Sequence, residues 1–288
     1  MRLQIQAPGG LLYLLAHAGE ISLPGDSSVG DDRPAATESG RLLVFTDVTD
    51  LTRAVQMKAD FAANASHELR TPLSAILAAA ETLRLEGSRS MSDTDQFLEV
   101  IERHGRRMQA MVVDLLDLSR LESPLARFEP QPVRTRDVAA EMHADFSEGL
   151  SAKKLAWRVD IAPGCHEMTV HPDLIRIVLR NLIENAIRFT APGGFVALSV
   201  KRVDGDIRLE VADNGCGIPP EDQERVFERF YQVARARSGA DRGTGLGLSI
   251  VRHAVAAMSG TVELESAVGK GTRVTVSIPQ PRMRNGEL

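Results

Sequence analysis

The segment around residue 181 carries polar side chains that suit a metal-bound phosphate. Asn181, Asn185 and Arg188 are four and three residues apart, so a helix would place them on one face. An amide oxygen is a hard ligand that suits Mg²⁺, and a guanidinium suits phosphate oxygens. Together these residues could bind a metal-nucleotide complex. A solvated helix face is the alternative interpretation of this segment taken alone.

A carboxylate followed by two glycines could recognise a purine base. Asp213 ends an apolar stretch and leads into a turn that contains Gly215 and Gly217. Glycine lets the backbone approach a flat ligand closely. A carboxylate at such a place can accept a hydrogen bond from an exocyclic amine, which selects adenine over guanine. An ordinary turn at the end of a strand is the alternative.

A glycine-rich loop at residues 243–247 precedes a segment with helical periodicity. Backbone amides that glycines expose at a helix N-terminus bind phosphate. Glycines at alternate positions also occur in tight turns, so the loop alone is weak evidence. Residues 234–242 before it are small and polar, which is typical of a lid over a nucleotide.

An upstream histidine could accept a phosphoryl group. His67 lies beside the heptad position of Ser66, so we expect its imidazole to be accessible to solvent. An exposed imidazole can attack phosphorus, and the adjacent Glu68 can take the other ring proton. Thr71 follows one helical turn later, and Pro72 predicts a kink there. A lone surface pair of this kind usually has no catalytic role, so the hypothesis depends on the downstream nucleotide site.

Two heptad patterns predict the helices that carry this histidine. A short turn at residues 87–90 separates them, so the helices should be antiparallel, each about 45 Å long. In a lone hairpin, one side of the apolar heptad seam of each helix would stay exposed to water. We therefore expect two copies to form a four-helix bundle. His104, the rival phosphoacceptor, lies on the second seam, where a packed histidine is expected. The seams comprise Val55, Ala59, Ala62, Ser66, Leu69, Leu73, Ile76, Ala80 and Leu83, then Phe97, Ile101, His104, Met108, Met111, Leu115 and Leu118.

The remaining segments predict an α/β sandwich after the hairpin and an incomplete module before it. Pro124, Pro130 and Pro132 mark a linker. Helices are expected at 138–153, 173–188 (with Asp173 as N-cap) and 248–258, and strands at 156–161, 195–202, 207–213, 261–266 and 272–278. Residues 1–48 contain two β-like runs, 11–17 and 41–48, around a mobile loop at 24–40. Such a segment is either a remnant of a larger domain or a disordered leader. The overall class is α+β.

Composition excludes several classes of protein. A net charge of −5 gives no electrostatic case for nucleic acid as the main partner. Cys165 and Cys216 lie far apart without metal-ligand spacing, so we expect neither a disulfide framework nor a zinc site. The sequence contains no apolar run of about 18 residues and no signal-peptide pattern. We therefore expect no membrane span and a cytoplasmic location for the chain as given.

The motifs, in their order, resemble those of sensor histidine kinases. Residues 61–73 resemble the phosphoacceptor box of that family, and 181–186 its N box. Residues 213–217 and 243–247 resemble its two glycine boxes, and 227–231 its F box. The resemblance implies a helical hairpin for dimerisation and histidine phosphotransfer at 54–123, an ATP-binding domain of the Bergerat or GHKL type at 128–280, and a tail at 281–288. Residues 40–49 resemble the exit of a PAS sensor module, which implies a degenerate or partial PAS-like segment and linker at 1–50. The resemblance also leads to the hypothesis that the chain is a fragment of a longer, membrane-anchored receptor.

The resemblance also implies roles for individual residues. His67 would be autophosphorylated from Mg-ATP, with Glu68 as proton acceptor and Asn185 as Mg²⁺ ligand, in a homodimer that passes the phosphoryl group to a response-regulator aspartate. Thr71 would position the water that dephosphorylates the regulator. Asn181 stands where related ATPases have a glutamate base, which favours phosphotransfer over hydrolysis. The remaining ATP contacts implied are Asn181, Arg188, Phe189, Asp213, Gly215, Gly217, Ile218, Phe227, Gly243, Thr244, Gly245, Leu246, Gly247 and Leu248.

One position differs from the family pattern. Gln232 stands where the F box often has an arginine, so one phosphate contact is missing unless Arg229, Arg235 or Arg237 replaces it. A nucleotide-binding signalling scaffold with little kinase activity, or a member in which phosphatase activity dominates, is therefore the alternative function. Plain ATP hydrolysis is a third hypothesis, which Asn181 disfavours.

Overall fold

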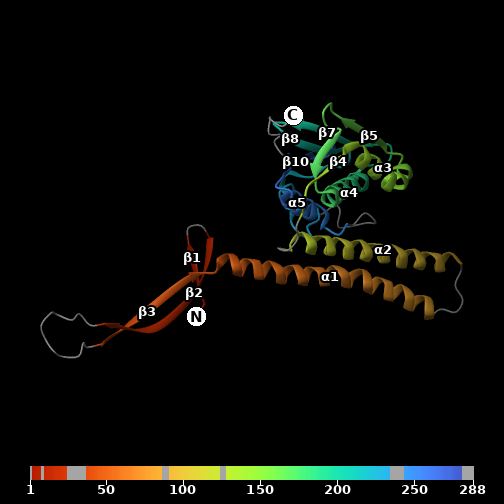
Figure 1. Cartoon of the computed structure of the whole chain (residues 1–288). Coiled ribbons are helices and arrows are strands. Elements are labelled where there is room, and N and C mark those ends of the chain that lie inside the picture. The colour runs from red at the N-terminus through yellow and green to blue at the C-terminus, as the bar shows by residue number, and fades with distance from the viewer. Residues whose placement is uncertain are drawn as a thin grey trace, which may run out of the picture. The chain divides into compact units, whose positions relative to one another are not determined.

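A computed structural model of the chain describes residues 2–7, 10–24, 37–85, 91–123, 128–233 and 243–280 (Figure 1). The chain forms two compact units, Met1–His67 and Glu68–Leu288. The predicted hairpin turn at 87–90, the lid at 234–242, most of the loop at 24–40 and the tail at 281–288 lie outside the described residues.

The first unit contains three antiparallel strands in the order β1-β2-β3. These strands are β1 (Arg2–Ala7), β2 (Gly10–Pro24) and β3 (Thr37–Asp47). Residues 11–17 and 41–47 are strands as predicted, but both strands are longer, and β1 was not expected. Helix α1 (Thr49–Leu85) then begins at a cap in which the Thr49 amide donates to Asp47 Oδ1 at 2.9 Å. The resemblance of this segment to a PAS module stays a prediction.

Helices α1 and α2 (Met91–Leu121) form the predicted antiparallel pair (Figure 1). The second seam is confirmed, since each of its positions is buried or half-buried and Met111 and Leu118 are fully buried. The first seam was partly wrong: Pro72 and Ala79 are buried, whereas Leu73 is exposed. Within a single hairpin each helix buries only the face that meets the other helix. The heptad positions that would meet a second hairpin in a four-helix bundle, such as Leu73, stay exposed. Pro72 lies inside α1 without ending the helix, and the predicted kink stays a prediction.

The rest of the second unit is an α/β sandwich, which confirms the predicted fold class. Its sheet has the strand order β5-β7-β8-β10-β9, in which β5 and β7 are parallel and the other pairs are antiparallel. Helices α3, α4 and α5 pack against one side of the sheet (Figure 1). The elements are α3 (Thr135–Ala152), β5 (Ala156–Ile161), α4 (Pro172–Phe189), β7 (Phe195–Val203), β8 (Asp206–Asp213), α5 (Gly247–Ala257), β9 (Thr261–Ala267) and β10 (Gly271–Ile278).

Burial explains why these segments adopt their elements. In β7 and β8 alternate residues are buried, because one face of the sheet meets the helices and the other meets water. In α4 the apolar side that contains Ile175, Leu179 and Ile183 is at most 1% exposed, so it is anchored in the core. The hairpin between β7 and β8 turns at Asp204 and Gly205, which both have positive φ, as the predicted two-residue turn requires.

Two strands and one cap differ from expectation. Strands β4 (Gln131–Arg134) and β6 (Glu167–Val170) pair in a separate small sheet, and β4 contains Pro132, which was assigned to the linker. Proline is tolerated in a strand that has only one neighbour. Helix α4 begins one residue before Asp173, and its cap is His171, whose Nδ1 accepts from the Leu174 amide at 3.4 Å.

Candidate nucleotide site

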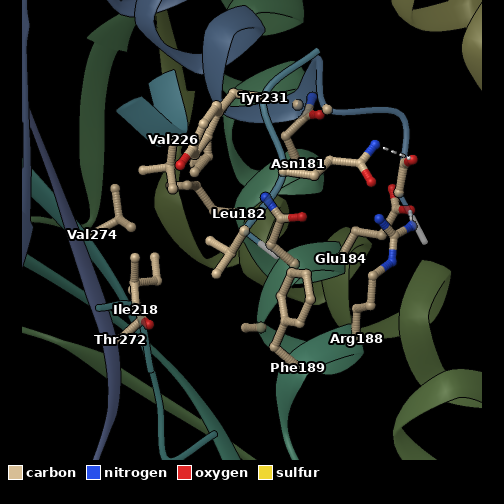
Figure 2. Close-up of a pocket in the computed structure, with 18 of the residues that line it drawn as sticks. Asn181, Leu182, Glu184, Arg188, Phe189, Ile218, Val226, Tyr231, Thr272 and Val274 are labelled. Atoms are coloured by element: carbon tan, nitrogen blue, oxygen red, sulfur yellow. Dashed lines mark hydrogen bonds and ion pairs between the residues drawn. The ribbon is translucent and has the colours of Figure 1, made fainter. Parts of the chain in front are cut away.

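A pocket of about 980 Å³ opens beside α4, with α5, β8, the β9–β10 hairpin and α2 around it. Its walls differ in character. Leu182, Phe189, Ile218, Val226 and Val274 form an apolar part. Figure 2 shows Ile218, Val226 and Val274 across the pocket from Asn181, Glu184 and Arg188 of α4. An apolar end suits a flat base, and a polar end suits phosphates and metal. The pocket therefore fits an amphiphilic ligand such as a nucleotide.

The polar face of α4 enters this pocket as the sequence predicted. Asn181, Asn185 and Arg188 all line it, and Asn181 is 7% exposed. The Asn181 side chain donates from Nδ2 to the Ile177 carbonyl at 2.8 Å. Its Oδ1 faces Gly247, where an added Cβ would lie 2.8 Å from it. The helix thus presents the amide oxygen of Asn181 to the start of α5.

Neighbouring groups position the end of α4. Arg188 forms an ion pair with Glu184, and both line the pocket. Lys153 donates from Nζ to the carbonyls of Ile187 at 2.9 Å and Arg188 at 2.8 Å. A cation satisfies the unpaired carbonyls of a helix C-terminus, and here it holds the turn that presents Phe189. No sequence pattern indicates this role for Lys153, because an isolated lysine is most often solvated.

Asp213 is held by two backbone amides. Its Oδ1 accepts from Gly215 at 2.8 Å and from Thr272 at 3.2 Å. Burial raises the pKa of the Asp213 carboxyl, and the hydrogen bonds from Gly215 and Thr272 oppose that rise. The carboxylate lines the pocket with its second oxygen unused by these two amides, so it can accept a hydrogen bond from a ligand.

The turn after Asp213 requires glycine for close backbone contact. Gly217 has φ +68°, and an added Cβ would lie 2.0 Å from the Ala267 carbonyl oxygen. Gly271 has φ +102°, and its Cβ would lie 2.0 Å from the Asp213 carbonyl oxygen. The β9–β10 hairpin is therefore locked against the Asp213 turn. Sequence reasoning found both the turn and the hairpin but missed the contact between them, because that contact joins residues far apart in the chain.

The glycine loop is held at its first residue and at its middle by residues in and just after the F box. The Phe230 amide donates to the Gly245 carbonyl at 2.8 Å, and Gln232 Nε2 donates to the Gly243 carbonyl at 2.9 Å. Gly247 is the first residue of α5, so the loop leads into a helix N-terminus as predicted. Gln232 lines the pocket, and this amide contact is made to the loop backbone.

Most of the residues predicted to contact ATP line this pocket, but three do not. Gly215, Phe227 and Leu246 are absent from its walls within the described residues. Gly215 instead allows close approach to the Phe189 carbonyl, and Leu246 is fully buried beneath the loop. The predicted residues that do line the pocket are Asn181, Asn185, Arg188, Phe189, Asp213, Gly217, Ile218, Gly243, Thr244, Gly245, Gly247 and Leu248.

The candidates for replacing the missing F-box arginine are accounted for only in part. Arg229 forms an ion pair with Glu122 at the end of α2 and lies 3.4 Å from His253 Nε2. It does not line the pocket within the described residues. Arg235 and Arg237 lie outside the described residues. Arg229 is thus directed toward α2 in this structure.

Helix α2 supplies a wall of the pocket that the sequence did not predict. Arg106, Arg107, Ala110 and Asp114 line it. The Thr244 hydroxyl in the glycine loop donates to Asp114 Oδ2 at 2.7 Å. One turn further on, Asp117 forms a 3.0 Å ion pair with Arg180. Acidic residues on a long helix normally indicate a solvated face, so no sequence pattern distinguishes Asp114 and Asp117 from solvent-exposed residues.

Asp114→Asn is expected to stabilise the fold at alkaline pH. Burial raises the pKa of Asp114 to about 6 from its usual 3.8, although the Thr244 hydrogen bond opposes the rise. A raised carboxyl pKa means that its favourable contribution is present below about 3.8 and lost as pH rises through about 6. At pH 8 the buried charge should cost about 3 kcal/mol of unfolding free energy. Urea unfolding at pH 8 and pH 5 should show a gain for Asp114→Asn that shrinks on acidification.

Asp117→Asn is the matched control on the same helix. Asp117 is 13% exposed and paired with Arg180, so losing its charge should destabilise the fold at both pH values. A gain for Asp114→Asn that is equal at pH 8 and pH 5 would contradict the account of Asp114.

The two candidate histidines differ as predicted. His67 is exposed, and His104 is half-buried. Burial, and then the nearby charges of Arg103 and Arg107, lower the pKa of His104. Thr71 is also exposed, one turn after His67 in α1. Glu68 pairs with Arg107 of α2 at 2.9 Å.

A metal ion could be held here only together with ligand phosphates. Within the described residues no cluster of three or more His, Cys, Asp or Glu side chains could bind one alone. Asn185 lines the pocket with a hard amide oxygen, and Mg²⁺ usually keeps several waters and phosphate oxygens as ligands. The donor set therefore fits Mg²⁺ bound as a nucleotide complex.

Comparisons with known proteins match both halves of this architecture. Residues 170–282 match the family described as histidine kinase-, DNA gyrase B- and HSP90-like ATPase. Residues 57–124 match the His Kinase A (phospho-acceptor) domain. In the part of the chain that the structure covers, no helix is both long and apolar enough to cross a membrane.

Individual relatives cover most of this chain. The sensor-like histidine kinase SenX3 of Mycolicibacterium smegmatis is 33% identical over 266 residues, which are 91% of this chain and 69% of that protein. The sensor histidine kinase RppB of Synechocystis sp. is 37% identical over 229 residues, 79% of this chain and 50% of that protein. The solved structure of the Acinetobacter baumannii histidine kinase AdeS aligns with a TM-score of 0.59 at 25% identity and covers 75% of this chain and 98% of that one. The chain thus spans between half and about two thirds of the length of the two relatives.

Proposed function

The chain belongs to the sensor histidine kinase family, and from this premise we propose that it transfers the γ-phosphoryl group of ATP to His67 and then to an aspartate of a response regulator. The observation that carries the proposal is the pocket in which Asp213, the α4 amides and the glycine loop meet, in one chain with an exposed histidine in a phosphoacceptor segment. The activity of a longer receptor would rest on the same transfer.

The pocket supports specific roles for its residues. The unused oxygen of Asp213 accepts from the adenine amino group, and Phe189 and Ile218 contact the ring. The amides of the glycine loop and Arg188 hold phosphates at the start of α5. Arg188 must exchange its pairing with Glu184 for the phosphates, which are the stronger anion. Asn185 would hold Mg²⁺, and the chemistry that the ion would supply is neutralisation of phosphate charge.

The transfer itself needs a nucleophile and a proton acceptor. A ring nitrogen of His67 forms a bond to the γ-phosphorus as the bond from that phosphorus to the β–γ bridging oxygen breaks, and ADP leaves. Glu68 accepts the proton from the other ring nitrogen, so the imidazole does not carry a full positive charge. Asn181, an amide, has no basic group to activate water, so transfer to His67 is favoured over hydrolysis.

We also infer that the working form is a homodimer. Within the second unit, large apolar side chains of both helices are exposed, with Leu73 at 45%, Leu77 at 54% and Leu116 at 56%. Their burial in a four-helix bundle would stabilise the pair by roughly 25 cal/mol per Å² of apolar surface. Light scattering of the purified chain should give twice the monomer mass.

The experiment that tests the function is incubation with γ-labelled ATP and Mg²⁺. Label on the chain should be acid-labile and alkali-stable, as phosphohistidine is, and should pass to one member of a panel of response regulators. EDTA should abolish labelling, because Asn185 alone cannot neutralise the phosphates. Unlabelled chain that nevertheless binds an ATP analogue would favour the alternative, a nucleotide-binding scaffold or a phosphatase-dominant member. The side chain of Gln232, an amide that hydrogen-bonds the loop backbone in place of an arginine, favours that alternative.

Thr71→Ala is expected to separate the two activities. Thr71 is exposed one turn after His67, where its hydroxyl can position water for regulator dephosphorylation but takes no part in histidine attack. We expect phosphatase activity to fall about 10- to 100-fold with autophosphorylation within about twofold of wild type. Loss of labelled regulator over time measures the first and initial labelling the second. Thr82→Ala is the control, because Thr82 lies on the same helix but outside the phosphoacceptor segment at 61–73. A phosphatase rate unchanged by Thr71→Ala would contradict the role of Thr71 in positioning water.

A further inference from the structure

One ion pair joins the two helices of the hairpin beside the pocket. Arg107 Nη2 of α2 lies 2.9 Å from Glu68 Oε2 of α1, and the two side chains are only 14% and 22% exposed. The neighbouring pair on α2, between Arg106 and Glu102, has a 3.4 Å separation and is 81% and 68% exposed. An exposed pair contributes little, whereas a partly buried charge must keep its partner. Arg107 and Glu68 therefore fix one another.

We propose that Arg107 is a positioning residue for phosphoryl transfer, which holds the Glu68 carboxylate in the orientation that receives the proton from His67. This inference rests on the proposed function and extends it to a residue outside the recognisable motifs. Glu68 has three rotatable side-chain bonds and could otherwise turn away from its neighbour. The planar guanidinium restricts it through a charge-assisted hydrogen bond, which a lysine ammonium would give with weaker directionality.

The location of Arg107 also links the proton acceptor to the nucleotide. Its side chain lines the pocket as well as contacting Glu68. During transfer the nitrogen–phosphorus bond forms, the bond to ADP breaks, and the His67 proton moves to Glu68. Once protonated, Glu68 is neutral and binds the guanidinium less strongly, so the pairing is strongest before transfer, when orientation of the carboxylate matters.

The test is a double-mutant cycle on the full chain. Arg107→Gln should lower the initial autophosphorylation rate about 30- to 100-fold with the KM for ATP within about twofold. Arg107→Lys should recover about a tenth of the wild-type rate or more. In a Glu68→Gln background, Arg107→Gln should have almost no further effect, because the group on which it acts is gone. Arg103→Gln, the same change on an exposed side chain one turn earlier in α2, should leave the rate unchanged.

Two results would overturn the proposal. One is an Arg107→Gln rate equal to that of Arg103→Gln, and the other is a double variant whose loss is the product of the two single losses, with a raised KM for ATP. Urea unfolding and ATP-analogue binding of each variant show whether it folds, and Arg107→Lys, which keeps charge and length, carries the cycle if Arg107→Gln is unfolded. Absence of label on the wild-type chain would contradict the proposed function itself, before any variant is compared.

Discussion

A chain carrying His67→Gln is expected to gain no acid-labile, alkali-stable phosphate from γ-labelled ATP, a loss of at least about 10³-fold. Glutamine matches the polarity of histidine but has no nucleophilic ring nitrogen. His67 does not line the pocket, so binding of an ATP analogue should persist. Labelling and analogue binding on the same sample measure the two effects separately.

His104→Gln is the control for this experiment. His104 is half-buried on the seam of α2, and its burial lowers its pKa, so it should take no phosphate. The folded fraction of the His104→Gln chain should gain as much label as the wild-type chain. Label of the same acid and alkali behaviour on the His67→Gln chain would assign the phosphoacceptor elsewhere.

The parts of the site that sequence reasoning predicted are the local ones. In α4, helical spacing alone places Asn181, Asn185 and Arg188 on one face, and the apolar residues opposite them fix which face meets the core. Likewise, glycines before a helix N-terminus locate the phosphate loop without knowledge of its neighbours. Such patterns encode side-chain direction within a single element, which is why they could be predicted.

The parts that could not be predicted join elements far apart in the chain. Thr272 completes the hydrogen bonds of Asp213 from across 59 residues, and Asp114 reaches Thr244 across 130. Neither residue differs in type from ordinary strand or surface residues, and only the packing of the elements brings them to the site. Strands β4 and β6 were missed for a related reason, since each has four residues and too few positions to show alternation.

The F box shows how a motif can be found while its contacts are misassigned. Phe227 was expected against the nucleotide, but Val226 and Tyr231 line the pocket instead. Residues 225–227 form a short 3-10 helix, which has three residues per turn. Adjacent side chains therefore point in different directions, and an error of one residue assigns the wrong side chain to the ligand. Tyr231 is further fixed by a hydrogen bond to Asp222 and by Arg225 over its ring at 4.3 Å.

Asp213→Asn is expected to weaken ATP-analogue binding about 100-fold, the second large effect. The Gly215 and Thr272 amides both donate to Oδ1, so an asparagine must keep its oxygen there and turn its amino group toward the ligand. That group would face the adenine amino group, donor against donor. A guanine carbonyl could instead accept a hydrogen bond from the new side-chain amino group, so the variant should bind GTP better than the wild type does. The ratio of ATP affinity to GTP affinity should therefore fall by more than the ATP affinity itself. Competition of each nucleotide against a fluorescent ATP analogue measures both quantities.

Asp204→Asn is the matched control, because it makes the same exchange in the turn before β8 and outside the pocket. It should leave both affinities unchanged, since asparagine also tolerates positive φ. Loss of folding does not explain the expected result: burial raises the pKa of Asp213, so its charge opposes folding at pH 8 and the neutral amide should not lower stability. An Asp213→Asn chain that is folded and still prefers ATP as the wild type does would show that this carboxylate does not select the base.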